Sequence, residues 1–139
     1  MTKAMFATLV LGAAVAFAGP AFADKYKATL DAKSEVPPNA SPASGTADID
    51  YDAASKKLSW KITYSGLSGP ATAAHFHGPA ETGKNAGVEV AIPNVGTSPV
   101  EGSATLTDAQ AADLVSGKLY INFHTAANPG GEIRGQVTR

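Results

Sequence analysis

All three histidines of the chain fall in two short segments whose pattern predicts β-strands. His75 and His77 flank Phe76, and successive side chains of a strand point to opposite faces, so both imidazoles share one face. His124 follows Phe123 in a second segment of the same kind. If both phenylalanines point into a core, all three imidazoles lie on the outer face of one sheet. This pattern predicts a metal site.

Three imidazoles define which metals such a site would take. Imidazole nitrogen suits copper and zinc, and the Irving–Williams order places Cu(II) first for an all-nitrogen site. Along a strand His75 and His77 are ~6.5–7 Å apart, so their rings can lean toward one ion, with His124 as the third ligand from another strand. Three protein nitrogens leave a position open for water or a small anion. We therefore expect copper, with zinc as the second choice. The competing interpretation is that the histidines are solvated side chains on a wet sheet face.

Four further side chains are candidates to support the metal ligands: Glu132, Asn122, Tyr120 and Arg134. If residues 122–124 pair with residues 131–134, Glu132 shares the outer face with His124 and can accept a proton from its imidazole. The alternative for Glu132 is an exposed ion pair with Arg134 or a lysine, worth under ~1 kcal/mol. Tyr120 and Asn122 flank the site on the strand of His124, although neither residue type needs a function on a sheet surface.

Apolar and polar residues alternate in short segments separated by Gly, Pro, Asn and Ser, which predicts strands. One helix is expected over 107–116, because Thr107 and Gln110 have the spacing of a capping box and Gly117 can end it. About eight short strands with one helix predict an all-β fold, a single antiparallel Greek-key sandwich or barrel. The expected strands are 26–30, 45–51, 58–64, the first histidine segment 73–79, 88–92, 101–106, 118–124 and 132–137.

The beginning of the chain has the order of a secretory signal peptide. Lys3 precedes an apolar run over 5–17, and Ala21-Phe22-Ala23 forms a small-x-small cleavage site. The apolar run is shorter than the ~20 residues of a spanning helix. We therefore expect residues 1–23 to be removed after Ala23, which leaves one domain over 24–139, periplasmic or secreted, with no membrane span.

Composition narrows the chemistry further. The chain has 11 basic and 12 acidic residues, so no basic excess points to nucleic acid. It has no cysteine, which excludes disulfides, thiolate ligands and a cysteine nucleophile. Any metal must be held by imidazole, carboxylate or backbone oxygen.

Several motifs together resemble a known family. They are His75-Phe76-His77-Gly78-Pro79-Ala80, Leu106-Thr107, Gly117 to Thr125, and Asn128-Pro129-Gly130-Gly131-Glu132-Ile133-Arg134-Gly135-Gln136. With these motifs the sequence looks like the CHRD domain, the module first named in chordin, over essentially the whole of residues 24–139. That resemblance implies an all-β fold and, in bacteria, small exported proteins.

A weaker resemblance is to the copper half of copper–zinc superoxide dismutases, and it implies that His75, His77 and His124 are copper ligands. The chain has no fourth histidine to bridge to zinc, no zinc loop and no cysteine pair. The resemblance therefore implies a mononuclear copper site, in an immunoglobulin-like or superoxide-dismutase-like fold.

The sequence thus predicts an exported protein that binds one copper ion for carriage, buffering or one-electron chemistry. The alternative is a non-catalytic envelope or matrix interaction module in which the histidine motifs are structural. We assign no catalytic residue. If the protein is an enzyme, superoxide chemistry at copper is the expected reaction.

Overall fold

The computed structural model describes Gly12 and residues 23–139, so the predicted signal peptide lies almost wholly outside the described residues. Residues 24–139 form an eight-stranded antiparallel sheet that nearly closes into a barrel, and the predicted all-β class is confirmed. The elements in chain order are β1 (Asp24–Asp31), β2 (Ser44–Asp52), β3 (Lys57–Ser65), β4 (Ala71–His77), β5 (Val88–Ile92), β6 (Val100–Thr105), α1 (Asp108–Val115), β7 (Tyr120–Thr125) and β8 (Ile133–Gln136).

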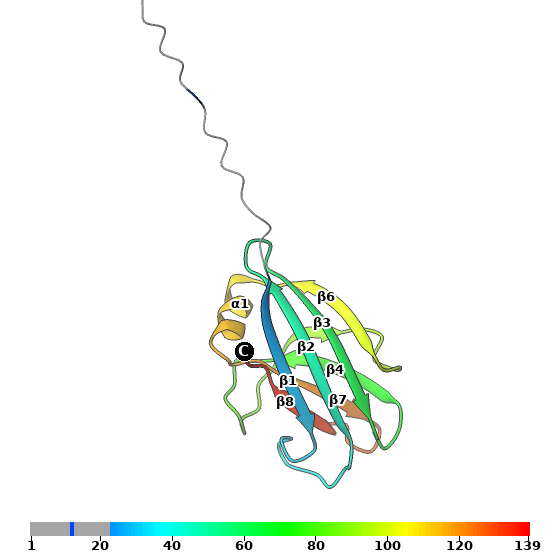
Figure 1. Cartoon of the computed structure of the whole chain (residues 1–139). Helices are drawn as coiled ribbons and strands as arrows, with labels where there is room; N and C mark the ends of the chain where they lie inside the picture. The colour runs from blue at the N-terminus through cyan, green and yellow to red at the C-terminus, as the bar shows by residue number, and fades with distance from the viewer. Residues whose placement is uncertain (1–11, 13–22) are drawn as a thin grey trace, which may run out of the picture.

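The strand order in the sheet is β5-β4-β7-β8-β1-β2-β3-β6. The β3–β4, β5–β6 and β6–β7 connections therefore cross between the two halves of the sheet. Figure 1 shows β1, β2 and β3 lying across β4 and β7, with α1 at one end. This topology brings β4 and β7 side by side, although 42 residues lie between His77, the last residue of β4, and Tyr120, the first residue of β7.

The core lies between these two halves. Along β3 the alternation predicts Trp60 to be inward, and it is 4% exposed. Its ring packs on Phe76 of β4 with 5.3 Å between ring centroids, and Tyr64 packs on Phe123 of β7 at 5.0 Å. Aromatic contacts of this kind stabilise a core beyond their buried area. They also fix which face of β4 and β7 points inward.

The helix begins and ends where the sequence predicts. Thr107 is the N-cap, and the reciprocal capping box with Gln110 is present. The helix ends before Gly117, which has a φ of 75°. The apolar Leu114 is fully buried and anchors this two-turn helix to the barrel, since so short a helix is not stable alone. Among the described residues, no helix is long and apolar enough to cross a bilayer.

The outer face of β7 and β8 is covered. Tyr120, Asn122 and Arg134 point outward by strand parity, yet none is more than 4% exposed. The loop over 78–87 lies against Tyr120 and Arg134: Arg134 donates to the Asn85 side chain at 2.9 Å, and the Ala86 N–H donates to the Tyr120 hydroxyl at 3.1 Å. At Tyr120 and Arg134 the sheet face is therefore not wet, because this loop excludes solvent from both side chains.

Candidate metal centre

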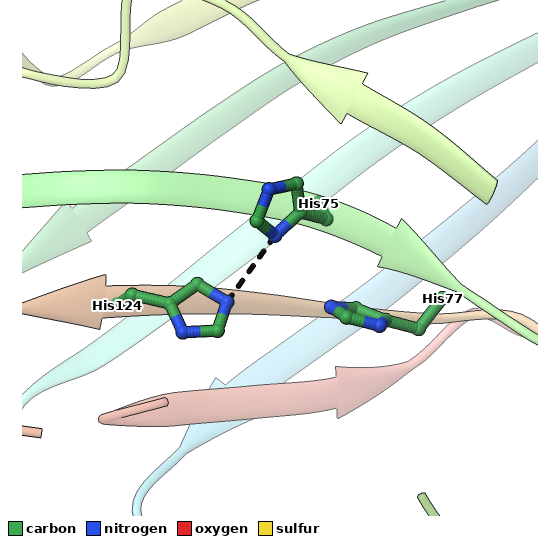
Figure 2. A group of neighbouring side chains, drawn as sticks. All are labelled: His75, His77 and His124. Atoms are coloured by element: carbon green, nitrogen blue, oxygen red, sulfur yellow. Dashed lines mark hydrogen bonds between the residues drawn. The ribbon is translucent and has the colours of Figure 1, made fainter. Parts of the chain in front are cut away.

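Strand pairing places the three histidines together. β4 pairs with β7 so that His75 lies opposite Asn122 and Ala73 lies opposite His124. Phe76 and Phe123 are fully buried in the core, so parity directs all three imidazoles to the outer face. Figure 2 shows the rings of His75 and His77, from β4, and of His124, from β7, gathered in one place. The predicted convergence is confirmed.

The separations between the rings suit a single ion. One nitrogen from each histidine can be chosen so that all three lie within 4.8 Å of one another. His75 Nδ1 and His124 Nε2 are 3.2 Å apart. Nitrogens bound to one ion at ~2 Å each lie roughly 3–4 Å apart. A slight closing of the rings would therefore bring the three nitrogens to bonding range.

Backbone carbonyls fix the tautomers of two of these histidines. His77 Nδ1 lies 2.9 Å from the Ala86 carbonyl oxygen, and His124 Nδ1 lies 2.9 Å from the Pro129 carbonyl oxygen. A carbonyl oxygen only accepts, so each Nδ1 carries the hydrogen. In a neutral imidazole the other nitrogen, Nε2, then holds the lone pair. This is the outer hydrogen bond that metal-ligating histidines commonly make.

The electrostatics favour the neutral form that a metal requires. Burial lowers the pKa of His75, and the neighbouring imidazoles of His124 and His77 lower it further. Burial also lowers the pKa of His77. The Nε2 atom of His77 is buried with no hydrogen-bond partner among the described residues. A buried, unpaired lone pair on a neutral imidazole is available for a metal ion.

Tyr120 and Arg134 support His77 in a stack. The Tyr120 ring lies parallel to the His77 ring, with an interplanar angle of 5° and 4.9 Å between centroids. The Arg134 guanidinium lies over the Tyr120 ring, 3.5 Å from the ring centroid. The Tyr120 hydroxyl also donates to the Ala86 carbonyl at 3.2 Å. Tyr120 therefore positions both the ring of His77 and the carbonyl that sets its tautomer.

Glu132 does not have the predicted contact with an imidazole. Its carboxylate accepts hydrogen bonds from Ser41, Ser68, Thr125 and Asn128. The alternative, an ion pair with Arg134 or a lysine, is also absent among the salt bridges of the described residues. The reason is local: β8 begins at Ile133, so strand parity does not extend back to Glu132. Glu132 directly follows the 128–131 turn and lies beside Thr125 instead of His124.

Glu132 instead joins three loops. Burial raises its pKa, but hydrogen bonds from Ser68, Thr125 and Asn128 outweigh burial and lower the pKa to about 2. The carboxylate thus stays ionised while fully buried. Its hydrogen bonds link the loops that contain Ser41, Ser68 and Asn128.

Glu35 is a residue near the site that the sequence analysis missed. It lies in the β1–β2 loop, is 3% exposed, and has no periodic or motif signal in the sequence. Burial raises its pKa, while the Val36 N–H, Asn122, Arg134 and His124 act in the opposite direction. An isolated acid beside prolines reads as an ordinary loop residue, so only the fold shows that it is next to Asn122.

The arrangement can hold one ion with three nitrogen ligands and leave further positions open. Of the described residues, these three histidines form the cluster with metal-ligand geometry. Imidazole ligation fits Cu and Zn.

Comparison with known proteins agrees with this fold. The model of the CHRD domain matches residues 26–137, which span β1 to β8 and include all three histidines. Neither curated proteins nor solved structures give a significant match to the chain. The family match covers far more than half of the sequence, so this chain belongs to the CHRD domain family.

Proposed function

We propose that this CHRD domain binds one copper ion through His75, His77 and His124, and carries or buffers copper outside the cytoplasm. The observation that carries the proposal is the approach of three ligand nitrogens to within 4.8 Å on one sheet face. Tautomers already set by backbone carbonyls support it, because the ligands need little reorganisation on binding.

Copper is favoured by the donor set. Three imidazoles without a carboxylate or thiolate suit Cu(II) first and Zn(II) next. An open coordination position permits ligand exchange, as carriage or one-electron chemistry requires. Export is supported by the composition of residues 1–23.

The test is titration of Cu(II) into residues 24–139, followed by electron paramagnetic resonance. We expect one equivalent to bind with nitrogen hyperfine structure. His75→Ala, His77→Ala and His124→Ala, alone and together, should remove that signal. A matched control is Asp48→Asn with Asp50→Asn, which removes two outward carboxylates of β2 and leaves the histidines intact. Unchanged affinity and spectrum in the triple histidine variant would exclude the site.

A second candidate function is an interaction module in which the histidines are structural. It is favoured by the hydrogen bonds of His77 and His124 to Ala86 and Pro129, which tie two loops to the sheet. If this is the role, His77→Ala and His124→Ala lower the melting temperature equally with and without copper. The copper proposal instead expects copper to raise the melting temperature of the wild type and not of the variants.

A further inference from the structure

Three buried polar atoms beside the histidine cluster have no hydrogen-bond partner among the described residues. They are Glu35 Oε1, Asn122 Oδ1 and His77 Nε2. Glu35 is 3% exposed and Asn122 is 4% exposed. Leaving such atoms unpaired costs free energy, and more for a charged group than for a neutral one. A site that gathers three of them is therefore suited to a ligand.

Gly131 holds Glu35 and Asn122 next to each other. A Cβ at position 131 would lie 2.2 Å from Glu35 Oε1 and 2.8 Å from Asn122 Nδ2, so both side chains fill the space that the glycine leaves. Asn122 in turn lies opposite His75 on the paired strand. Its side chain is near enough to hydrogen-bond both groups, which acts to lower the pKa of Glu35 and to raise that of His77, in each case against the effect of burial. Asn122 thus connects the carboxylate to the histidines.

The three unpaired atoms share one property: all are acceptors. His77 Nε2 bears a lone pair because Nδ1 donates to Ala86, while a carboxylate oxygen and an amide oxygen accept. The Asn122 amide nitrogen lies beside Glu35 and is an internal donor for its carboxylate. An occupant can supply an electron-pair acceptor for the imidazole and further hydrogen-bond donors for the two oxygens.

We propose that Glu35 and Asn122 form a hydrogen-bonding subsite for a small neutral ligand on the open position of the metal, with water as the resident ligand. This inference rests on the proposed function, because the ligand is held between the ion and the two oxygens. The metal takes the lone pairs of the histidines, and the two hydrogens of a bound water match the two acceptors. Glu35 is a positioning residue in this scheme and not a metal ligand.

The subsite selects by charge. The Glu35 carboxylate repels an anion on the ion, whereas it accepts from water or another neutral donor. Arg134 is the neighbouring cation, and it is 2% exposed, with its two terminal nitrogens donating to Asn85 and to the Lys84 carbonyl. Its charge offsets that of Glu35. Removal of the carboxylate charge would leave Arg134 unbalanced and make the site attractive to anions.

The test is azide binding to the Cu(II)-loaded protein at pH 8, followed by the charge-transfer absorption of copper–azide. We expect Glu35→Gln, which keeps the shape of the side chain, to raise azide affinity by roughly tenfold or more. The matched control is Glu101→Gln, an exposed carboxylate on β6, a strand that pairs with neither β4 nor β7. It should leave azide affinity unchanged.

Each outcome has a distinct meaning. Copper binding is measured first: a wild type that binds no copper overturns the proposed function. Azide affinity in Glu35→Gln equal to that of the wild type overturns the subsite alone. Loss of copper from Glu35→Gln, as from the histidine variants, would show that Glu35 is a ligand and would also overturn it. If Glu35→Gln does not fold, the wild type decides: it should bind azide more weakly than a small three-nitrogen Cu(II) complex without a carboxylate.

Discussion

His75 Nδ1 lies 3.2 Å from His124 Nε2, although the two residues are 49 positions apart in the chain. They are diagonal neighbours across β4 and β7, since His124 pairs with Ala73. Because the Pro129 carbonyl holds the hydrogen of His124 on Nδ1, its Nε2 accepts, and His75 donates from Nδ1 when no metal is bound. A metal ion would take the place of that hydrogen between the two rings, with His75 binding as the neutral tautomer that carries its hydrogen on Nε2. The centre is therefore assembled only when the sheet is complete, which couples metal binding to folding.

The first prediction concerns these tautomers. In the metal-free protein at pH 8, nitrogen-15 spectra of the imidazoles should show His77 and His124 protonated on Nδ1. One equivalent of a diamagnetic ion, Zn(II), should shift the Nε2 resonances of both and leave their Nδ1–H signals in place. An Nε2–H tautomer at His77 or His124 would contradict the hydrogen bonds to Ala86 and Pro129.

A pair of adjacent glycines tests the packing beside the site. Gly131 has a φ of 127°, and a Cβ there would lie 2.2 Å from Glu35 Oε1. Gly131→Ala should therefore destabilise the fold by ~2 kcal/mol or more, through backbone strain and steric overlap. A Cβ at Gly130 would meet nothing within 4 Å, so Gly130→Ala should change the unfolding free energy by less than ~1 kcal/mol. Urea unfolding of both variants measures the difference. Equal stabilities would mean that Gly131 is not in close contact with Glu35.

The histidine cluster could be predicted from the sequence because it depends on parity. Phe76 and Phe123 are strong core residues, so the histidines next to them had to face outward once the strands were recognised. The sequence does not encode the pairing of β4 with β7 in any local pattern, and the structure supplies it.

The supporting residues could be predicted only in part. Tyr120, Asn122 and Arg134 keep strand parity and lie near the site. Glu132 lies one residue outside β8, where parity no longer applies. Glu35 comes from a loop, and its position depends on long-range packing that no local pattern encodes. The limit of prediction thus coincides with the ends of the regular strands.

Glu132 gives a prediction about acid stability. Its carboxylate accepts several hydrogen bonds in the interior, so Glu132→Gln should lower the unfolding free energy by roughly 2–3 kcal/mol at pH 7. The folded-state pKa is about 2, below the ordinary value of 4.5. The stabilisation by Glu132 is therefore fully present above about pH 4.5 and is lost as the pH falls toward 2. The difference between wild type and variant in urea should shrink across that window. A difference independent of pH would contradict the ionised, hydrogen-bonded carboxylate.

Copper affinity should follow the protonation of the ligands. Burial and neighbouring imidazoles lower the pKa of His75, and burial lowers that of His77. Both stay neutral below the ordinary value of 6.5, so they do not take up protons in competition with copper until more acidic pH. Copper affinity measured with a competing chelator should therefore change little between pH 8 and 6.5, because His75 and His77 take up almost no protons in this range. It should then fall by up to about tenfold per pH unit for each histidine that becomes protonated. A steep loss above pH 6.5 would contradict the lowered pKa values.

Tyr120 offers the sharpest test of the support behind a ligand. Its hydroxyl holds the Ala86 carbonyl that fixes His77, while its ring stacks on His77. Tyr120→Phe keeps the ring and removes the hydroxyl, so we expect a copper affinity about 10-fold lower, the lower end of the effect of such outer hydrogen bonds. Tyr64→Phe is the matched control, since its hydroxyl also donates to a carbonyl, that of Val95 at 2.6 Å, but Tyr64 packs on Phe123 on the core side. Both variants should lose ~1 kcal/mol of stability, and only Tyr120→Phe should lose copper affinity. Equal affinities in the two variants would show that the Ala86 carbonyl does not control His77.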